Sequence, residues 1–75
     1  MSYNIYRLIG AKLQCERTRK GIKQEYIAKQ LKTNRTKISK IENGSVKISI
    51  SVLLIYCKIL ELSLPELFTD IDKYF

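Results

Sequence analysis

The chain has 75 residues and a mass of 8.8 kDa, which is enough for one small domain with a single hydrophobic core. Fourteen Lys and Arg residues against seven Asp and Glu residues give a net charge of +7, and a hydrophobic content of 45% is that of an ordinary globular protein. Two cysteines without any histidine are too few for a disulfide framework or a zinc site. The sequence also lacks a histidine base, a glycine-rich phosphate loop and paired carboxylates, so we expect no enzyme, no cofactor and no metal.

The charge is unevenly distributed along the chain. Residues 1–60 contain thirteen Lys and Arg but three acidic residues, whereas residues 61–75 contain four acidic residues and one lysine. This distribution favours a basic body that meets a polyanion and an acidic, apolar tail with another role, the alternative being basic residues that only keep the domain soluble. There is no apolar stretch of about 18 residues and no cationic leader, so we expect no membrane partner and a cytoplasmic location.

A hydrophobic period of about 3.6 residues predicts five helices, and hence a single all-α domain over residues 1–75. The first helix is predicted over residues 3–20, and Gly21 ends it. Two short helices follow over residues 24–31 and 35–42, separated by a break at residues 32–34. Asn34 is a good cap for the second of them, Asn43-Gly44 ends it, and Ala28 is small enough for two helices to cross closely.

A fourth helix, capped by Ser49, is apolar over much of its circumference, and we expect it in the middle of the molecule. Ser63 caps a fifth helix. The tail contains more large apolar residues than a frayed chain end would. This predicts a dimer interface through the fourth and fifth helices. The alternative is that the tail folds back onto the core of its own chain. The residues of this predicted interface are Leu67, Phe68, Ile71, Tyr74 and Phe75. The side chains expected only to pack are Cys15, Cys57, Tyr6, Tyr26 and Tyr56.

The pair of short helices within residues 24–43 describes a helix-turn-helix, whose second helix enters the major groove of DNA. At 100° per residue, Ile38 and Ile41 fall on one side of this second helix. The polar residues on the opposite side are Arg35, Thr36, Ser39 and Lys40. None of them is acidic, whereas an ordinary solvated helix face mixes both signs of charge. The pattern therefore favours DNA binding over a plain helical interaction module.

The runs GIKQEYIA from Gly21 and RTKISKIENG from Arg35 resemble the Cro/repressor-type helix-turn-helix family, also called the xenobiotic response element family. The segment LSLPELF at residues 62–68 is similar to the start of that family's fifth helix. The resemblance implies a five-helix lambda-repressor-like fold and a transcriptional regulator that binds a palindromic operator in double-stranded DNA as a homodimer. Small members include phage repressors, restriction–modification controllers and antitoxin-type regulators. The alternatives are therefore a module whose main partner is a protein, and a nonspecific or RNA-binding basic protein.

The resemblance also implies roles for single residues. The base-reading positions are Arg35, Thr36, Ser39 and Lys40, of which Lys40 suits a base edge and a phosphate equally. The positions expected at the DNA backbone are Gln24, Asn43 and Lys47, with Lys23 adding charge nearby and Lys37 on the rim, open to phosphate or to solvent. A largely buried salt bridge between Arg17 and Glu42 is implied between the first and third helices.

Two positions depart from the family pattern. Lys32 stands where the turn usually has glycine, so we expect a left-handed conformation at Lys32 that costs about 1–2 kcal/mol. Lys23 replaces the usual Ser or Thr cap, and its side chain has no acceptor oxygen, which weakens the start of the second helix by about 1 kcal/mol. Both departures predict a modestly stable domain.

Overall fold

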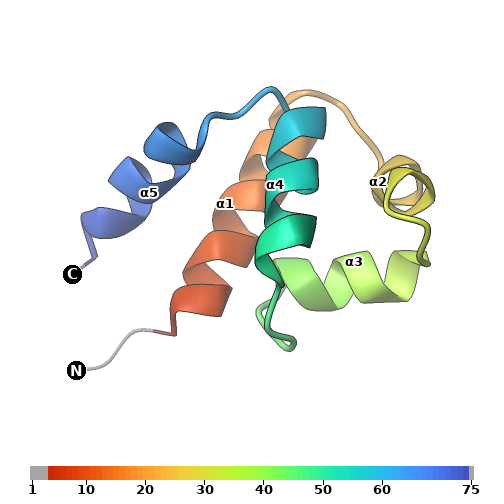
Figure 1. The fold of residues 1–75 in the computed structure, drawn as a ribbon, viewed down its shortest axis with the longest axis horizontal. Helices are drawn as coiled ribbons and strands as arrows, with labels where there is room; N and C mark the ends of the chain where they lie inside the picture. Colours follow the sequence, from red (N-terminus) through yellow and green to blue (C-terminus); the bar gives the residue numbers. More distant parts are fainter. Residues whose placement is uncertain (1–3, 75) are drawn as a thin grey trace.

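The computed structural model describes residues 4–74 and contains five helices and no strand in that range. The helices are α1 (Ile5–Arg19), α2 (Gln24–Gln30), α3 (Arg35–Glu42), α4 (Ile50–Ile59) and α5 (Leu64–Asp72). This is the five-helix, all-α fold that the hydrophobic period predicts, and it agrees with the lambda-repressor-like fold that the resemblance implies. Figure 1 shows α1 and α4 in the middle of the molecule, α2 and α3 together at one end, and α5 at the opposite end. None of the helices within residues 4–74 has the length and apolar content needed to cross a membrane.

Short polar side chains fix where four of the five helices begin. Asn4 accepts from the backbone amides of Tyr6 and Arg7, so α1 begins at Ile5 rather than at the predicted residue 3, which lies outside the described residues. Three further caps behave in the same way for α3, α4 and α5, and they are Asn34, Ser49 and Ser63. Lys23 precedes α2 and makes no capping hydrogen bond through its side chain, as predicted.

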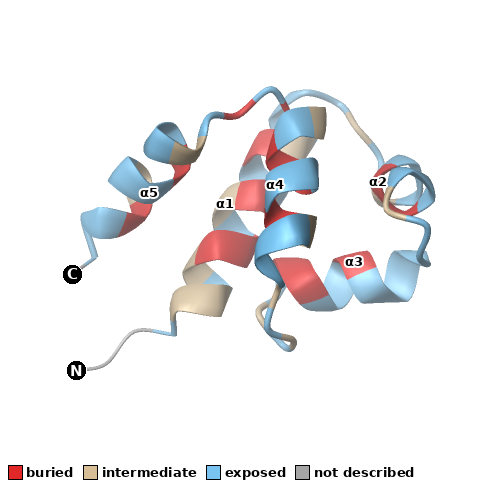
Figure 2. Cartoon of the chain, in the orientation of Figure 1, coloured by how far each residue is buried: buried red, intermediate tan, exposed pale blue. Residues whose placement is uncertain are grey.

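The hydrophobic core is formed by one side of each helix. Its largest fully buried side chains are Leu13, Ile27, Ile38, Tyr56, Leu60 and Leu67. Figure 2 shows buried stretches on α1, α3 and α4 in the middle of the molecule. Ala28 is buried where α2 packs against α3, which agrees with the need for a small side chain at a close crossing.

Gly10 controls how closely α1 and α3 approach each other. It is buried in α1, and a Cβ atom at this position would overlap the backbone carbonyl oxygens of Ile41 and Glu42. Because glycine has no side chain, the end of α3 lies directly against α1. This close approach places the side chain of Glu42 within reach of Arg17, almost two turns further along α1 at about 3.6 residues per turn.

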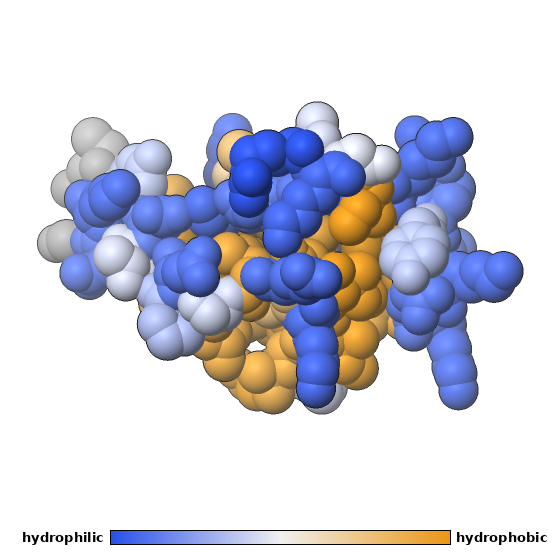
Figure 3. Space-filling view, turned by 90° about the horizontal axis from the view of Figure 1, so that it is seen from above, coloured by the Kyte–Doolittle hydropathy of each residue, from blue (hydrophilic) through white to orange (hydrophobic). Residues whose placement is uncertain are grey.

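α4 lies in the middle of the molecule as expected, but it is packed by one side only, although it is apolar over much of its circumference. Its buried residues lie on one side only and are Leu53, Tyr56 and Cys57. The apolar residues on its outer side are Ile50, Leu54 and Ile55, with exposed fractions of 71%, 45% and 47%. The helices described in residues 4–74 leave this side uncovered, and Figure 3 shows an apolar area in the middle of the molecule between two hydrophilic ends. An amphipathic pattern cannot identify the buried side when both sides are apolar.

The predicted dimer interface in the tail is wrong for two of its residues. Leu67 and Ile71 are buried in the core of their own chain, because α5 folds back against α1. Phe68 and Tyr74 are 42% and 53% exposed, and Phe75 lies outside the described residues. The tail therefore folds back in part, which was the alternative for this segment.

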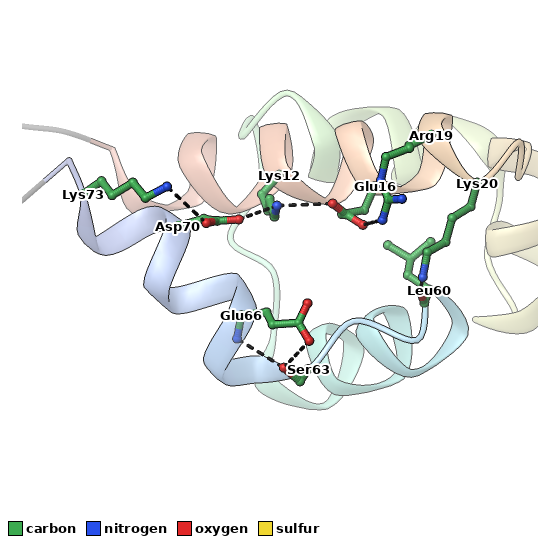
Figure 4. Close-up of polar contacts among 9 residues, drawn as sticks. All are labelled: Lys12, Glu16, Arg19, Lys20, Leu60, Ser63, Glu66, Asp70 and Lys73. Carbon is green, nitrogen blue, oxygen red and sulfur yellow. Dashed lines mark hydrogen bonds and ion pairs between the residues drawn. The ribbon is translucent and has the colours of Figure 1, made fainter.

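Ion pairs attach α5 to α1 (Figure 4). Lys12 Nζ lies 2.5 Å from Asp70 Oδ2 and 3.2 Å from Glu16 Oε1, and so joins the two helices. The contact with Lys12 holds the pKa of Asp70 below its ordinary value. Lys20, at the end of α1, also donates to the carbonyl oxygen of Leu60 after α4. The ion pair between Lys12 and Asp70 thus adds to the burial of Leu67 and Ile71 in holding α5 on its own domain.

Two side chains expected to pack are exposed instead. Cys15 lies on the outer face of α1, and Tyr26 on α2 has an exposed fraction of 52%. Both helices pack by one side only, so their remaining positions face solvent. Tyr56 and Cys57 are buried as predicted, and Tyr6 is half-buried.

Candidate nucleic-acid interface

A three-residue turn fixes the angle between α2 and α3. Lys32 has a φ of +56°, so the left-handed conformation predicted for this position is present. The backbone amide of Thr33 donates to the carbonyl oxygen of Ala28 at 2.9 Å, and closes the end of α2. Asn34 then caps α3 by accepting from the amide of Lys37 at 2.9 Å. The predicted helix-turn-helix is therefore formed by α2, this turn and α3.

The outward face of α3 is polar because two isoleucines hold its other face in the core. Ile38 is fully buried and Ile41 is 3% exposed. The four predicted base-reading side chains are all exposed, and they are Arg35, Thr36, Ser39 and Lys40. Lys37, expected on the rim of this face, is exposed as well. One short helix thus presents three cationic and two hydroxyl side chains to solvent.

The acidic residues of the helix-turn-helix are kept away from this face or paired with a cation. Residues 24–42 contain two acids, Glu25 and Glu42. Glu42 is buried with an exposed fraction of 4%, whereas Glu25 is exposed on α2 and its Oε1 lies 3.1 Å from Arg35 Nε. The acid-free surface predicted for α3 alone therefore has one carboxylate beside it, contributed by the neighbouring helix. A projection of a single helix cannot reveal such a contact.

Glu42 joins four helices through its carboxylate. Arg17 of α1 donates to both oxygens, from Nε to Oε2 at 2.7 Å and from Nη2 to Oε1 at 3.1 Å. Gln24 of α2 donates to Oε1 at 3.0 Å, and the hydroxyl of Tyr56 of α4 donates to Oε2. Arg17 also donates to the carbonyl oxygen of Ile22 at 2.7 Å, in the connection to α2. The salt bridge between Arg17 and Glu42 is present as the resemblance implies, but Gln24 and Tyr56 were missed as its partners.

The electrostatic environment keeps Glu42 ionised. Burial by itself favours the neutral form, but the hydrogen bonds from Arg17, Tyr56 and Gln24 outweigh it and hold the pKa of Glu42 below its ordinary value. Burial and the hydrogen bond to Glu42 raise the pKa of Tyr56 far above its ordinary value, so its hydroxyl stays a donor. A buried charge with this many donors fixes the end of α3 relative to α1, α2 and α4.

The residues predicted at the DNA backbone flank α3 on two sides. Lys23 is exposed and Gln24 is half-buried at the start of α2, while Asn43 and Lys47 are exposed after the end of α3. Gln24 uses one of its amide hydrogens to hold Glu42, which leaves the second for another acceptor. The side-chain oxygen of Asn43 accepts from the amide of Ser45 at 2.9 Å, so its side-chain nitrogen is the donor available to a phosphate.

Residues 4–74 contain no cluster of His, Cys, Asp and Glu side chains that could hold a metal ion. The polar hollow between the starts of α2 and α3 is instead lined by cations and by groups that hold them. Its lining residues are Arg17, Lys23, Gln24, Glu25 and Arg35. A hollow with an excess of positive charge next to an exposed polar helix suits an anionic polymer.

These features define a helix-turn-helix domain, in which the second helix presents a polar face and the first supports it. The family model of the helix-turn-helix domain matches residues 10–73, and the chain belongs to this family of DNA-binding domains. The match includes α2, the turn and α3, and extends through α5. A comparison with curated proteins gives no match.

Proposed function

We propose that the protein is a sequence-specific transcriptional regulator, of repressor or controller type, that binds double-stranded DNA in the cytoplasm. The observation that carries this proposal is the outward face of α3, which is exposed, free of acids and held in place by Ile38 and Ile41. In the proposed complex α3 lies in the major groove. The side chains that read base edges there are Arg35, Thr36, Ser39 and Lys40.

The flanking residues would then bind phosphates and fix the position of α3 on the duplex. We assign this role to Lys23, Gln24, Lys37, Asn43 and Lys47, which lie around α3 and carry donors or positive charge. Contacts of this kind supply affinity that falls with rising salt, and base contacts supply the preference for one sequence. Arg35 is suited to a guanine, because its guanidinium can donate to O6 and N7 together.

The proposed regulator acts as a homodimer on a palindromic operator. The exposed apolar face of α4, formed by Ile50, Leu54 and Ile55, is the best candidate for the contact, with Phe68 of α5 as a further exposed apolar group. In Figure 1 α3 lies at one end of α4. A twofold axis parallel to α4 would therefore leave both copies of α3 at the same end of the dimer. Two half-sites about one helical turn apart, roughly 34 Å, match such an arrangement.

The same apolar face favours one other function, which is that of an antitoxin-type module whose main partner is another protein. An exposed apolar patch suits a protein partner as well as a second copy of the chain. Purification of the native protein distinguishes the two, since a second polypeptide in equal amount would favour the module and a single polypeptide would favour the homodimer.

Selection of binding sites from a pool of random duplexes tests the proposed function. We expect enrichment of an inverted repeat whose half-sites each contain a guanine read by Arg35. In a parallel selection, Arg35→Ala should relax the preference at that base pair, whereas Lys37→Ala should weaken binding to all sequences alike. A pool without any enriched sequence, or equal competition by random DNA and RNA, would contradict the proposal.

A further inference from the structure

Glu25 is unusual for its position in the molecule. It is the one acidic residue in the range 24–42 whose side chain is exposed, since Glu42 is buried. If α2 and α3 face a polyanion, an exposed carboxylate there opposes binding by charge repulsion. Glu25 also lies in the first turn of α2, where the helix dipole favours an acidic residue. The dipole acts on the carboxylate directly and does not require an ion-pair partner for it. The contact of Glu25 with Arg35 calls for a separate explanation.

We propose that Glu25 is the positioning residue for Arg35, and that it determines which edge of the Arg35 guanidinium faces a base. This inference rests on the function proposed above, because it assumes that Arg35 reads DNA. Glu25 is the second residue of α2 and Arg35 the first residue of α3, so their contact spans the two helices of the helix-turn-helix. The closest approach is 3.1 Å, between Glu25 Oε1 and Arg35 Nε.

The atoms of this contact suit recognition of guanine. The carboxylate of Glu25 forms its ion pair beside Nε, at the inner edge of the guanidinium. The outer edge, with Nη1 and Nη2, is then the edge that can donate to O6 and N7 of a guanine. Without the carboxylate, the long and flexible arginine side chain has other acceptors within reach, above all the phosphates on either side of the groove. Glu25 would thus favour donation from the Arg35 guanidinium to the base over donation to a phosphate.

The contact has little value for the stability of the free protein, which favours a role in binding. The side chains of Glu25 and Arg35 are 63% and 70% exposed, and exposed ion pairs contribute little to folding. Of the two other cations that line the hollow, Arg17 is already held by Glu42 and by the carbonyl oxygen of Ile22, and Lys23 is exposed at the start of α2. When DNA covers the hollow and displaces water, the attraction between Glu25 and Arg35 becomes stronger.

The test measures discrimination rather than affinity. Wild-type protein, Glu25→Ala and Glu25→Gln are titrated with the selected duplex and with a duplex in which the Arg35-dependent base pair is exchanged. The wild type should prefer the selected duplex by about 5- to 150-fold. Glu25→Ala should lower this ratio by about threefold or more, and Glu25→Gln, which keeps a neutral acceptor, should lie between the two. In an Arg35→Ala background, Glu25→Ala should change the ratio no further.

A matched control separates positioning from charge. Glu61→Ala removes the same kind of exposed carboxylate at the turn between α4 and α5, and it should leave the discrimination ratio unchanged. If Glu25→Ala raises affinity for both duplexes equally and keeps the wild-type ratio, Glu25 acts by charge repulsion alone and the proposal is overturned. A wild-type protein without preference for any duplex would instead overturn the proposed function, and this inference with it.

Discussion

At the last position of α3, the carboxylate of Glu42 accepts hydrogen bonds from side chains of α1, α2 and α4. An anion at the C-terminus of a helix is disfavoured by the helix dipole, and a buried anion is disfavoured by loss of hydration. Four hydrogen bonds, two of them from the guanidinium of Arg17, offset both effects. Single-residue changes in this cluster should therefore have large effects on stability although they lie behind the proposed DNA surface.

Glu42→Gln should lower the free energy of unfolding by about 3–5 kcal/mol. It leaves the largely buried Arg17 without its counter-charge, and it places an amide NH₂ group, which is a donor, against the donors of Arg17, Gln24 and Tyr56. The expected loss is a large part of the stability of a domain of this size. Chemical denaturation at neutral pH measures the change. Glu61→Gln, at an exposed position, should change the free energy of unfolding by less than about 0.5 kcal/mol. Equal effects of the two substitutions would show that the Glu42 cluster is not a main support of the fold.

The same cluster predicts a pH dependence of stability. The pKa of Glu42 is lower in the folded protein than its ordinary value of 4.5, so the unfolded chain binds a proton more readily. The resulting stabilisation is fully present above pH 4.5 and is lost as the pH falls through the lower, folded pKa. Wild-type protein should therefore lose more stability than Glu42→Gln between about pH 7 and about pH 3. Parallel pH profiles of the two proteins would contradict this assignment.

Among the elements, the helix-turn-helix could be predicted most completely from the sequence. The signals were local, namely the break at residues 32–34, the Asn34 cap and the spacing of Ile38 and Ile41, and each of them decides structure within one or two turns of helix. The sequence contains no comparable local signal for the contacts between helices. The approach of Glu25 to Arg35 and the donors Gln24 and Tyr56 depend on how the helices pack.

The less predictable elements were α4 and α5. Both sides of α4 are apolar, so its sequence could not show that Ile50, Leu54 and Ile55 face outward. In α5 the apolar residues suited burial in the chain's own core as well as burial in a dimer, and the ion pair between Lys12 and Asp70 connects residues 58 positions apart. Such long-range pairing has no local pattern in the sequence.

The turn between α2 and α3 contains strain that glycine would relieve. Lys32→Gly removes the cost of about 1–2 kcal/mol that a residue with a side chain has in the left-handed backbone conformation. The greater conformational freedom of glycine in the unfolded chain lowers the stability by about 0.4–1 kcal/mol. We expect a net stabilisation of about 0.5–1 kcal/mol in thermal denaturation, with unchanged DNA affinity. Lys29→Gly, an equivalent change inside α2, should destabilise by about 1 kcal/mol instead. Destabilisation by both substitutions would contradict the strain assigned to Lys32.

At the scale of the whole molecule, the proposed DNA surface and α5 lie at opposite ends, and the exposed face of α4 lies between them. We expect sedimentation equilibrium at high micromolar concentration to give twice the chain mass of 8.8 kDa. Leu54→Gln combined with Ile55→Gln should give the monomer mass while the fold is kept, because both residues are exposed. Tyr26→Gln, at an exposed aromatic residue on α2, should still form dimers. A wild-type mass of 8.8 kDa at all concentrations would exclude the dimer.

The account as a whole depends on α3 being the part of the protein that enters the duplex. Titration of isotope-labelled protein with a selected duplex, followed by the NMR signals of its backbone amides, tests this most directly. We predict that the largest shifts occur in residues 34–47 and at the start of α2, with small shifts in α5. Shifts concentrated in α5, with residues 34–47 unchanged at saturation, would contradict the account.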